Sequence, residues 1–199
     1  MPTGVAIRDV REQLFDAAER VLLRDGPHAL TSRAVTTEAG CAKGVLHKHF
    51  ADFDSFLAEL IFDRIGRLEV QAAALRAAAG TGTVADNLTG VLMDLFTSVA
   101  AAMLPLIIFR DDLRARLRQA GVRGVPVQTQ AMQMIIEYLG AERDFGRLAP
   151  GADPGTLALT LVGTAQMLYA DKDDHAPDAG AVRKFVISVI AGALPERSR

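Results

Sequence analysis

The segment from Thr31 to Phe50, TSRAVTTEAGCAKGVLHKHF, constrains the fold more than any other part of the chain. Gly40 interrupts a helical pattern, and glycine ends helices because it adopts positive φ without a Cβ clash. On each side of it, apolar residues four apart share a helix face: Val35 with Ala39, and Leu46 with Phe50. Thr31 stands where a helix N-cap is expected. The segment therefore predicts two short helices joined by a tight turn, a helix-turn-helix.

The second of these helices has an exposed face rich in hydrogen-bond donors. Once the apolar positions are assigned to the core, the residues left for solvent or a ligand are Lys43, Gly44, Val45, His47, Lys48 and His49. No carboxylate occurs from Cys41 to Ala51. Lysine reaches phosphates or guanine edges, and histidine can donate to either. Ser32 and Arg33, at the start of the first helix, are placed to meet a phosphate. A merely solvated helical hairpin is the alternative interpretation.

The same segment resembles the DNA-binding segment of the tetracycline-repressor (TetR) family of bacterial transcription regulators. The resemblance covers roughly residues 7–62, and it rests on Thr31, Arg33, Val35, Ala39-Gly40, Gly44, Leu46, His49-Phe50 and Asp52. It implies that the residues at or near DNA are Ser32, Arg33, Lys43, Gly44, Val45, His47, Lys48 and His49. Three positions depart from the family's usual residues. His47 replaces a tyrosine, and Phe53 replaces a lysine. Thr36 replaces a small alanine, but the threonine hydroxyl can fold back onto a carbonyl one turn earlier.

Composition favours a helical protein without a general affinity for nucleic acid. Of the 199 residues, half are hydrophobic and β-branched alternation is scarce, which predicts an all-α fold. The formal net charge is −2, and residues 1–60 carry seven Lys or Arg against nine Asp or Glu. DNA binding would therefore rest on a local patch. The single cysteine, Cys41, excludes a disulfide within the chain and suits a cytoplasmic protein; it is either an apolar filler beside Gly40 or a redox switch.

Further helices are predicted on both sides of this segment. We expect an N-terminal DNA-binding domain of three helices over residues 1–62 and a helical domain for effector binding and dimerisation over residues 63–199. Helices are predicted over residues 7–25, 52–79, 84–102, 111–119, 127–139, 154–170 and 179–194, with Pro105 as an interruption and residues 140–153 as an irregular connection. Residues 1–9 lack the apolar run of a signal peptide, and the longest apolar stretch, residues 99–109, contains Pro105 and is too short for a membrane span.

The last two predicted helices carry apolar stripes at helical spacing. These stripes could be buried within one subunit, or they could pair with a second copy into a four-helix interface. The family resemblance favours the homodimer, in which two recognition helices would read a palindromic operator on double-stranded DNA.

A cavity for a small effector is predicted in the C-terminal domain. Soft side chains that tolerate varied ligands could line it, although each could equally be ordinary core: Met93, Phe96, Met103, Ile107, Phe109, Met132, Ile136, Tyr138 and Met167. Charged groups that could orient a ligand there are few, with Arg110 and Glu137 as candidates. We expect an apolar or aromatic effector. Its binding would swing the helix of residues 53–79 as a lever, so the chain would be a ligand-responsive repressor.

Other classes of function fit the sequence less well. The four histidines are dispersed, so no metal site is expected, and neither a glycine-rich phosphate loop nor a nucleophile motif indicates an enzyme or a cofactor. A helical lipid or small-molecule carrier that binds no DNA is the alternative, favoured by the negative net charge and by Phe53.

Overall fold

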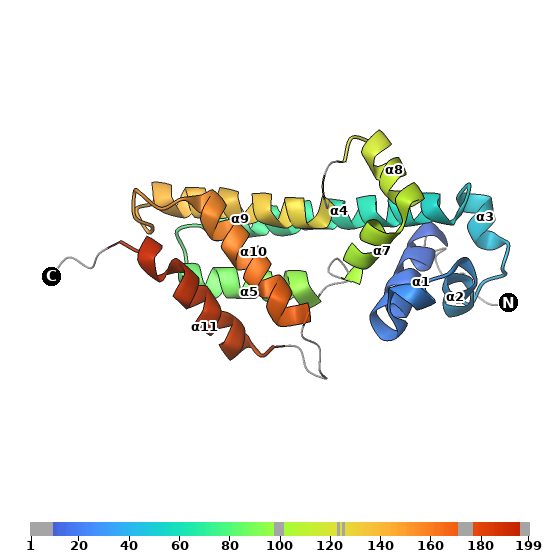
Figure 1. Cartoon of the computed structure of the whole chain (residues 1–199), viewed down its shortest axis with the longest axis horizontal. Coiled ribbons are helices and arrows are strands. Elements are labelled where there is room, and N and C mark those ends of the chain that lie inside the picture. Colours follow the sequence, from blue (N-terminus) through green and yellow to red (C-terminus); the bar gives the residue numbers. More distant parts are fainter. Residues whose placement is uncertain (1–9, 98–101, 123, 125, 171–176, 196–199) are drawn as a thin grey trace, which may run out of the picture. The chain divides into compact units, whose positions relative to one another are not determined.

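The computed structural model describes residues 10–97, 102–122, 124, 126–170 and 177–195, and these residues form helices and turns without a strand (Figure 1). The all-α fold class predicted from composition is confirmed. The chain divides into two compact units. Unit 1 holds the described residues of 1–64 and 99–123, and unit 2 holds those of 65–98 and 124–199. The functional division expected at residue 62 stays a prediction.

Unit 1 contains the predicted helix-turn-helix together with helices from two other parts of the chain. Its elements are α1 (Val10–Asp25), the 3-10 turn η1 (Pro27–Ala29), α2 (Ser32–Glu38), α3 (Val45–His49), the first half of α4 (Phe53–Ala77), α7 (Leu104–Phe109) and α8 (Asp111–Gln119). Pro105 lies in the first turn of α7, where its missing N–H costs no helical hydrogen bond. The apolar run that follows Pro105 is therefore a short helix.

A cluster of aromatic rings forms the centre of unit 1. Phe15 on α1, Phe50 after α3 and Phe56 on α4 are all buried. Their ring centroids lie 5.0–5.9 Å apart, and Phe50 meets Phe56 edge to face. Aromatic pairs at this spacing contribute beyond the area they bury. One cluster thus fastens three separate helices.

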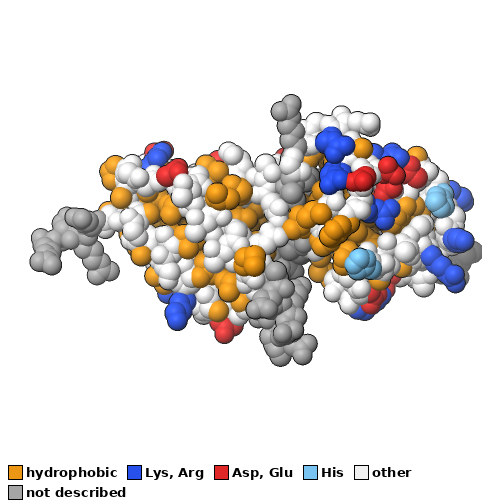
Figure 2. Space-filling model, in the orientation of Figure 1, with side chains coloured by type: hydrophobic (Ala, Val, Ile, Leu, Met, Phe, Trp, Pro, Cys, Tyr) orange, Lys and Arg blue, Asp and Glu red, His pale blue; other side chains and the backbone are white. Residues whose placement is uncertain are grey.

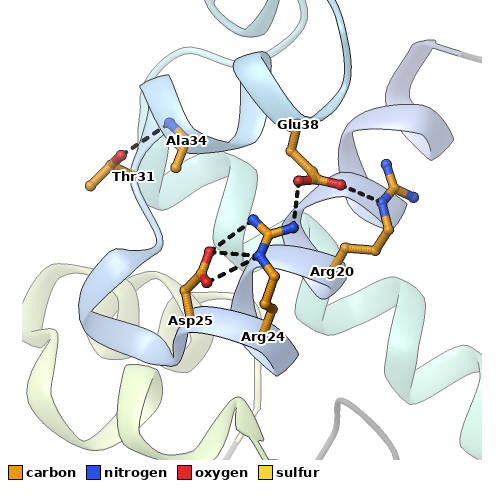
Figure 3. Close-up of polar contacts among 6 residues, drawn as sticks. All are labelled: Arg20, Arg24, Asp25, Thr31, Ala34 and Glu38. Carbon is orange, nitrogen blue, oxygen red and sulfur yellow. Dashed lines mark hydrogen bonds and ion pairs between the residues drawn. The ribbon is translucent and has the colours of Figure 1, made fainter.

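Ion pairs fasten the outer face of α2 to α1 (Figure 3). Arg20 Nε lies 2.7 Å from Glu38 Oε1, and Arg24 Nη1 lies 2.9 Å from Glu38 Oε2. Arg24 also pairs with Asp25. The two hydrogen bonds, first that of Arg20 and then that of Arg24, lower the pKa of Glu38. The end of α2 is thereby tied to the last turns of α1.

A buried arginine joins α1 to α4. The Arg64 side chain is only 4% exposed and pairs with Glu19 and Asp63, with Asp16 at 3.6 Å. A guanidinium removed from water in this way needs such partners, because an unpaired buried charge is costly. Arg64 therefore fixes α4 against the acidic side of α1.

Unit 2 is a bundle of longer helices. It holds the rest of α4, α5 (Val84–Thr97), α9 (Pro126–Asp144), α10 (Pro154–Ala170), α11 (Ala179–Ile190) and the 3-10 turn η2 (Ala191–Ala193). Contacts join α10 to α9, α11 and α5, and α11 packs on α5. The ion pair between Arg183 and Asp86, at 2.7 Å, links the surfaces of α11 and α5.

Several predicted helix bounds are confirmed, and one is wrong. Helices 111–119 and 154–170 have the predicted bounds. The irregular connection predicted to begin at Gly140 is wrong, because α9 continues to Asp144. The turn that closes the helix contains Gly146, whose φ is +71°. There the amides of Gly146 and Arg147 donate to the carbonyls of Arg143 and Glu142, the hydrogen bonds of a Schellman motif.

The predicted ends of other helices fall partly outside the described residues. This applies to residues 7–9 of the first helix and to residues 98–101 of the helix predicted to end at 102. The helix predicted over residues 179–194 is α11 followed by η2. Within the described part of the chain, no helix combines the length and the hydrophobicity that crossing a membrane requires.

Truncating Phe50 should destabilise the N-terminal unit. Phe50→Ala leaves a cavity between Phe15 and Phe56, and large-to-small changes of this kind cost about 3–5 kcal/mol. We expect a lower midpoint in urea denaturation. Phe109→Ala is the matched control, since that side chain is 78% exposed and should change the midpoint little. Equal effects of the two changes would show that the ring cluster does not hold the unit.

The pairing of Glu38 should make the unit sensitive to acid. Because the folded pKa of Glu38 lies below its ordinary value of 4.5, the ionised side chain stabilises the fold above that pH. That stability is lost as the pH falls through the folded pKa. Thermal unfolding of Glu38→Gln should therefore show a lower midpoint than the wild type at pH 7 and a smaller difference near pH 3. A constant difference between the two proteins would contradict this role.

Candidate nucleic-acid interface

The turn between α2 and α3 is built from local hydrogen bonds. The Thr31 hydroxyl accepts from the Ala34 amide at 3.1 Å, which confirms the predicted N-cap of α2 (Figure 3). At the other end of α2, Gly40 has φ +66°, and its amide donates to the Thr37 carbonyl. The Cys41 amide donates to the Thr36 carbonyl, which completes a second Schellman motif. The glycine is required here because a side chain with Cβ rarely adopts this backbone conformation.

Two buried side chains hold α3 in place. Leu46 is fully buried and Phe50 nearly so, as their predicted common face requires. The Phe50 amide donates to the Leu46 carbonyl at 3.0 Å, so the helix ends where the chain turns into the aromatic cluster. The opposite side of α3 is consequently directed away from the core.

All eight residues predicted to lie near DNA reach the surface of α2, α3 and their connection. Arg33, Lys43, Gly44, His47, Lys48 and His49 are exposed, whereas Ser32 and Val45 are partly buried. Figure 2 shows Lys, Arg and His side chains gathered over the end of unit 1 that carries α2 and α3. Beside this surface lies an open depression of about 340 Å³, whose lining includes Arg33, Thr37 and Arg24. Such a surface of cationic and donor groups can meet phosphates and base edges.

Most described acidic residues of the N-terminal segment form ion pairs, and the cations of this surface form none within the described part of the chain. Seven acids between residues 10 and 60 form ion pairs with arginine: Asp16, Glu19, Asp25, Glu38, Asp52, Asp54 and Glu59. Among the described residues, Arg33, Lys43 and Lys48 have no ion-pair partner. The excess of acids counted in the sequence is therefore neutralised elsewhere on the unit, and the charge left available around α3 is positive.

Two departures from the family pattern have structural explanations. The Thr36 side chain is buried, and its hydroxyl lies 3.0 Å from the Ser32 carbonyl and 3.1 Å from the Arg33 carbonyl, which confirms the predicted back-bonding. Phe53 stacks on Phe56 at 5.6 Å, and the Arg110 guanidinium lies 5.4 Å from its ring centre. Phe53 is thus part of the aromatic packing at the start of α4.

The soft residues predicted to line an effector cavity are distributed over both units. Met103, Ile107 and Phe109 belong to unit 1, and the other six belong to unit 2. Phe109 and Met167 are largely exposed, whereas Met103, Ile107 and Tyr138 are buried. Met93, Phe96, Met132 and Ile136 are partly buried. Their joint role around one ligand stays a prediction.

The two charged candidates for orienting an effector are engaged in other contacts. Arg110 pairs with Asp54 on α4 at 2.8 Å. Glu137 on α9 pairs with Arg76 at 2.7 Å and accepts from Gln133 at 3.0 Å. Both side chains thus already have partners. In the described part of the chain, no three His, Cys, Asp or Glu side chains gather to hold a metal ion.

Sequence reasoning missed two features. One is Tyr169 on α10, whose ring stacks on Phe96 at 5.3 Å. Its hydroxyl is buried without a hydrogen-bond partner among the described residues, and burial raises its pKa. The other is the pair Arg110 and Arg116, which reaches the start of α4 from residues far along the chain. The sequence carries no local signal for these contacts, because their partners lie 56 and 64 positions away along the chain.

Comparison with known proteins agrees with this geometry. Residues 14–60 match the family model described as bacterial regulatory proteins, tetR family. No curated protein matches the sequence. Among solved structures, a member of the TetR family from Streptomyces coelicolor A3 is 20% identical, with a TM-score of 0.64, over 94% of this chain and 99% of that one.

Two similar structures were solved with small molecules. The transcriptional regulator FadR from Bacillus subtilis, in complex with stearoyl-CoA, is 18% identical, with a TM-score of 0.64, over 91% of this chain and 98% of that one. A transcriptional regulator from Saccharomonospora viridis, in complex with choline, is 15% identical, with a TM-score of 0.70, over 95% and 99%. At these identities the likeness shows the fold alone.

The matched segment contains α2, the glycine turn and α3, and hence the exposed cationic surface described above. The match favours a DNA-binding regulator over a carrier without DNA affinity. The family model places residues 14–60 in the TetR family of bacterial regulatory proteins, and the helix-turn-helix and the all-α fold agree with a DNA-binding transcription regulator of that family.

Proposed function

We propose that this regulator is a ligand-responsive repressor that binds a palindromic operator as a homodimer. The observation that carries the proposal is the set of cations around α3 that have no ion-pair partner among the described residues, presented by a helix whose other side is buried through Leu46 and Phe50. In this proposal residues 1–62 bind DNA, and residues 63–199 bind the effector and the second subunit.

The exposed side chains of α2 and α3 would each make a different contact with DNA. Lys43 and Lys48 contact phosphates or guanine edges in the major groove, and His47 and His49 donate to either. Gly44 and the small exposed surface of Val45 let the backbone approach the DNA. Ser32 and Arg33, at the start of α2, contact a flanking phosphate. Because cations make these contacts, binding should weaken as salt rises, and because the contacts are few, it should depend on a second copy of the site.

The second copy would be recruited through α10 and α11. Large apolar side chains remain exposed along both helices: Leu159, Met167 and Leu168 on α10, and Ile187 on α11, followed by Leu194. In Figure 2 the surface over α10 and α11 carries hydrophobic groups with few charges between them. Exposed apolar side chains gathered on two helices that contact each other are typical of a protein interface. An isologous four-helix contact between two copies of α10 and α11 would cover these side chains.

Dimerisation would also set the form of the operator. One α3 reads only a few base pairs, whereas two copies related by a two-fold axis read a palindrome. Half-sites should then lie about one helical turn of DNA (~34 Å), or a multiple of it, apart.

The effector should be largely apolar or aromatic. Met93, Phe96, Met132 and Ile136 in unit 2 are only partly buried, so they retain apolar surface that a ligand can cover. The buried Tyr169 hydroxyl beside Phe96 has no hydrogen-bond partner among the described residues, and a ligand with one polar group would satisfy it. The stearoyl-CoA and choline complexes of similar folds support a small-molecule effector in general.

Release from DNA would follow from a shift between two placements of the helices. An effector that binds one placement better moves α4 and changes the separation of the two copies of α3. A differential affinity of about 1–3 kcal/mol is sufficient for such coupling.

Replacing Lys43 or Lys48 by alanine should weaken DNA binding. Each change removes one cation that the fold leaves unpaired, so we expect about a tenfold loss of affinity and a salt slope smaller by about one. Fluorescence anisotropy on a duplex selected from random DNA measures both quantities. Arg143→Ala is the matched control, because it removes one exposed positive charge from α9 and should leave affinity unchanged. Wild-type affinity in both lysine variants would contradict the proposed interface.

A charge in the apolar stripe should separate the subunits. Ile187→Glu places a carboxylate where the two copies of α11 would meet, and an unpaired buried charge is strongly unfavourable. We expect a monomer in sedimentation velocity at micromolar concentration, where the wild type is a dimer. Ala73→Glu, which adds the same charge to an exposed position of α4, should leave the dimer intact. A monomeric wild type would rule out the proposed assembly.

A further inference from the structure

Two arginines from a distant segment hold the first turn of α4. Arg110 lies between α7 and α8, and Arg116 lies on α8. Arg110 Nε and Nη2 each lie 2.8 Å from Asp54 Oδ1. Arg116 pairs with Asp52 and donates to the Ser55 hydroxyl at 2.9 Å. All of these residues belong to unit 1.

The turn that they hold is directly connected to α3. Phe50 ends α3, and Asp52 follows it by two residues. The position of Asp52 therefore determines the path of the chain after Phe50, and with it the position of the C-terminal end of α3. The other end of α3 is set by the turn at Gly40, which belongs to the helix-turn-helix itself. The contacts of Arg110 and Arg116 thus come from outside the three-helix segment.

The arginines are not required for capping α4. Asp52 Oδ1 already accepts from the Ser55 amide at 2.7 Å, which satisfies one of the free donors at the helix start. This hydrogen bond is the main cause of the lowered pKa of Asp52, with the charge of Arg116 as a smaller cause. The ion pairs are therefore not needed for α4 to form, and their role is a different one.

Buried leucines hold α8 in place, so Arg116 extends from a fixed position. Leu113 and Leu117, four residues apart, are buried, so one face of α8 is fixed in unit 1. Arg116 extends from a helix anchored in this way. The Arg110 side chain additionally lies over the Phe53 ring, which restricts it further.

We propose that Arg110 and Arg116 are positioning residues for DNA binding: by fixing Asp54 and Asp52 they set the orientation in which α3 is presented. They act through α4 and do not contact DNA. This inference rests on the DNA-binding function proposed for α3 and adds residues from the segment 99–123 to it.

The experiment must separate positioning from the simple effect of charge. Arg116→Ala removes a positive charge, so a loss of DNA affinity alone would not distinguish the two. Asp52→Asn removes a negative charge near the interface and keeps a residue that caps helices well. If charge alone mattered, Asp52→Asn would strengthen DNA binding. If Asp52 is an anchor for Arg116, the same change weakens binding.

We would measure the affinity of the full chain for the selected duplex over a series of salt concentrations. The variants are Arg116→Ala, Asp52→Asn, the double variant, and Arg118→Ala, which removes an exposed charge from the same helix without breaking an ion pair among the described residues. We expect Arg116→Ala and Asp52→Asn each to weaken binding about threefold to fivefold, as suits a partly exposed pair. The double variant should be no weaker than either single one. Arg118→Ala should match the wild type, and the salt slope of Arg116→Ala should be unchanged.

Four results would overturn the inference. Tighter binding by Asp52→Asn would mean that the carboxylate only repels DNA. A salt slope reduced by about one in Arg116→Ala would make Arg116 a phosphate contact. If Asp52→Asn bound DNA like the wild type while Lys43→Ala lost affinity, the DNA-binding proposal would stand. The positioning role of Arg110 and Arg116 alone would then be rejected. A wild-type chain that selects no duplex would overturn both. Circular dichroism melting of each variant shows whether it folds. If Arg116→Ala does not fold, Asp52→Asn still tests the inference.

Discussion

The burial of Leu46 and Phe50 is the interaction on which the DNA-binding surface depends. Helix α3 has only five residues, and a helix of that length is not stable in water by itself. It persists because Leu46 is fully buried and Phe50 enters the cluster with Phe15 and Phe56. Burying each side chain contributes about 1.5–3 kcal/mol. The same contacts direct Lys43 and Lys48 outward, so one set of apolar residues determines both the stability of α3 and what it presents.

The features that could be predicted from the sequence are those set by local chemistry. The N-cap at Thr31, the positive φ at Gly40 and the common face of Leu46 and Phe50 depend on residues within one or two turns of one another. The bounds of α8 and α10 were predictable for the same reason, since a proline or an aspartate opens each helix. The exposure of Lys43, Lys48 and His47 followed by elimination once the apolar positions were assigned.

What could not be predicted depends on residues far apart in the sequence. Gly140 looked like a helix end, yet α9 passes through it, because the buried Glu142 is held by Arg147 and the actual stop is the hydrogen-bonded turn at Gly146. The ion pairs of Arg110 and Arg116 with α4 join residues 56 and 64 positions apart, and no spacing rule links such residues. Likewise, the exposure of Phe109 and Met167 depends on which faces of their helices find partners, and composition does not determine this.

The pairing of acids also explains how a chain of net negative charge can carry a cationic binding surface. A count over the first 60 residues gives more acids than bases, which argues against DNA binding if charges are treated as a uniform total. In the fold, the arginines of α1, α4 and the segment 110–116 are used to neutralise those acids. Lys43 and Lys48 have no such partners in the part of the chain that the structure describes. Since the Debye length is about 8 Å at physiological salt, a phosphate at α3 senses mainly these nearby charges and little of the distant remainder. Local pairing, more than net charge, therefore decides where this protein can meet DNA.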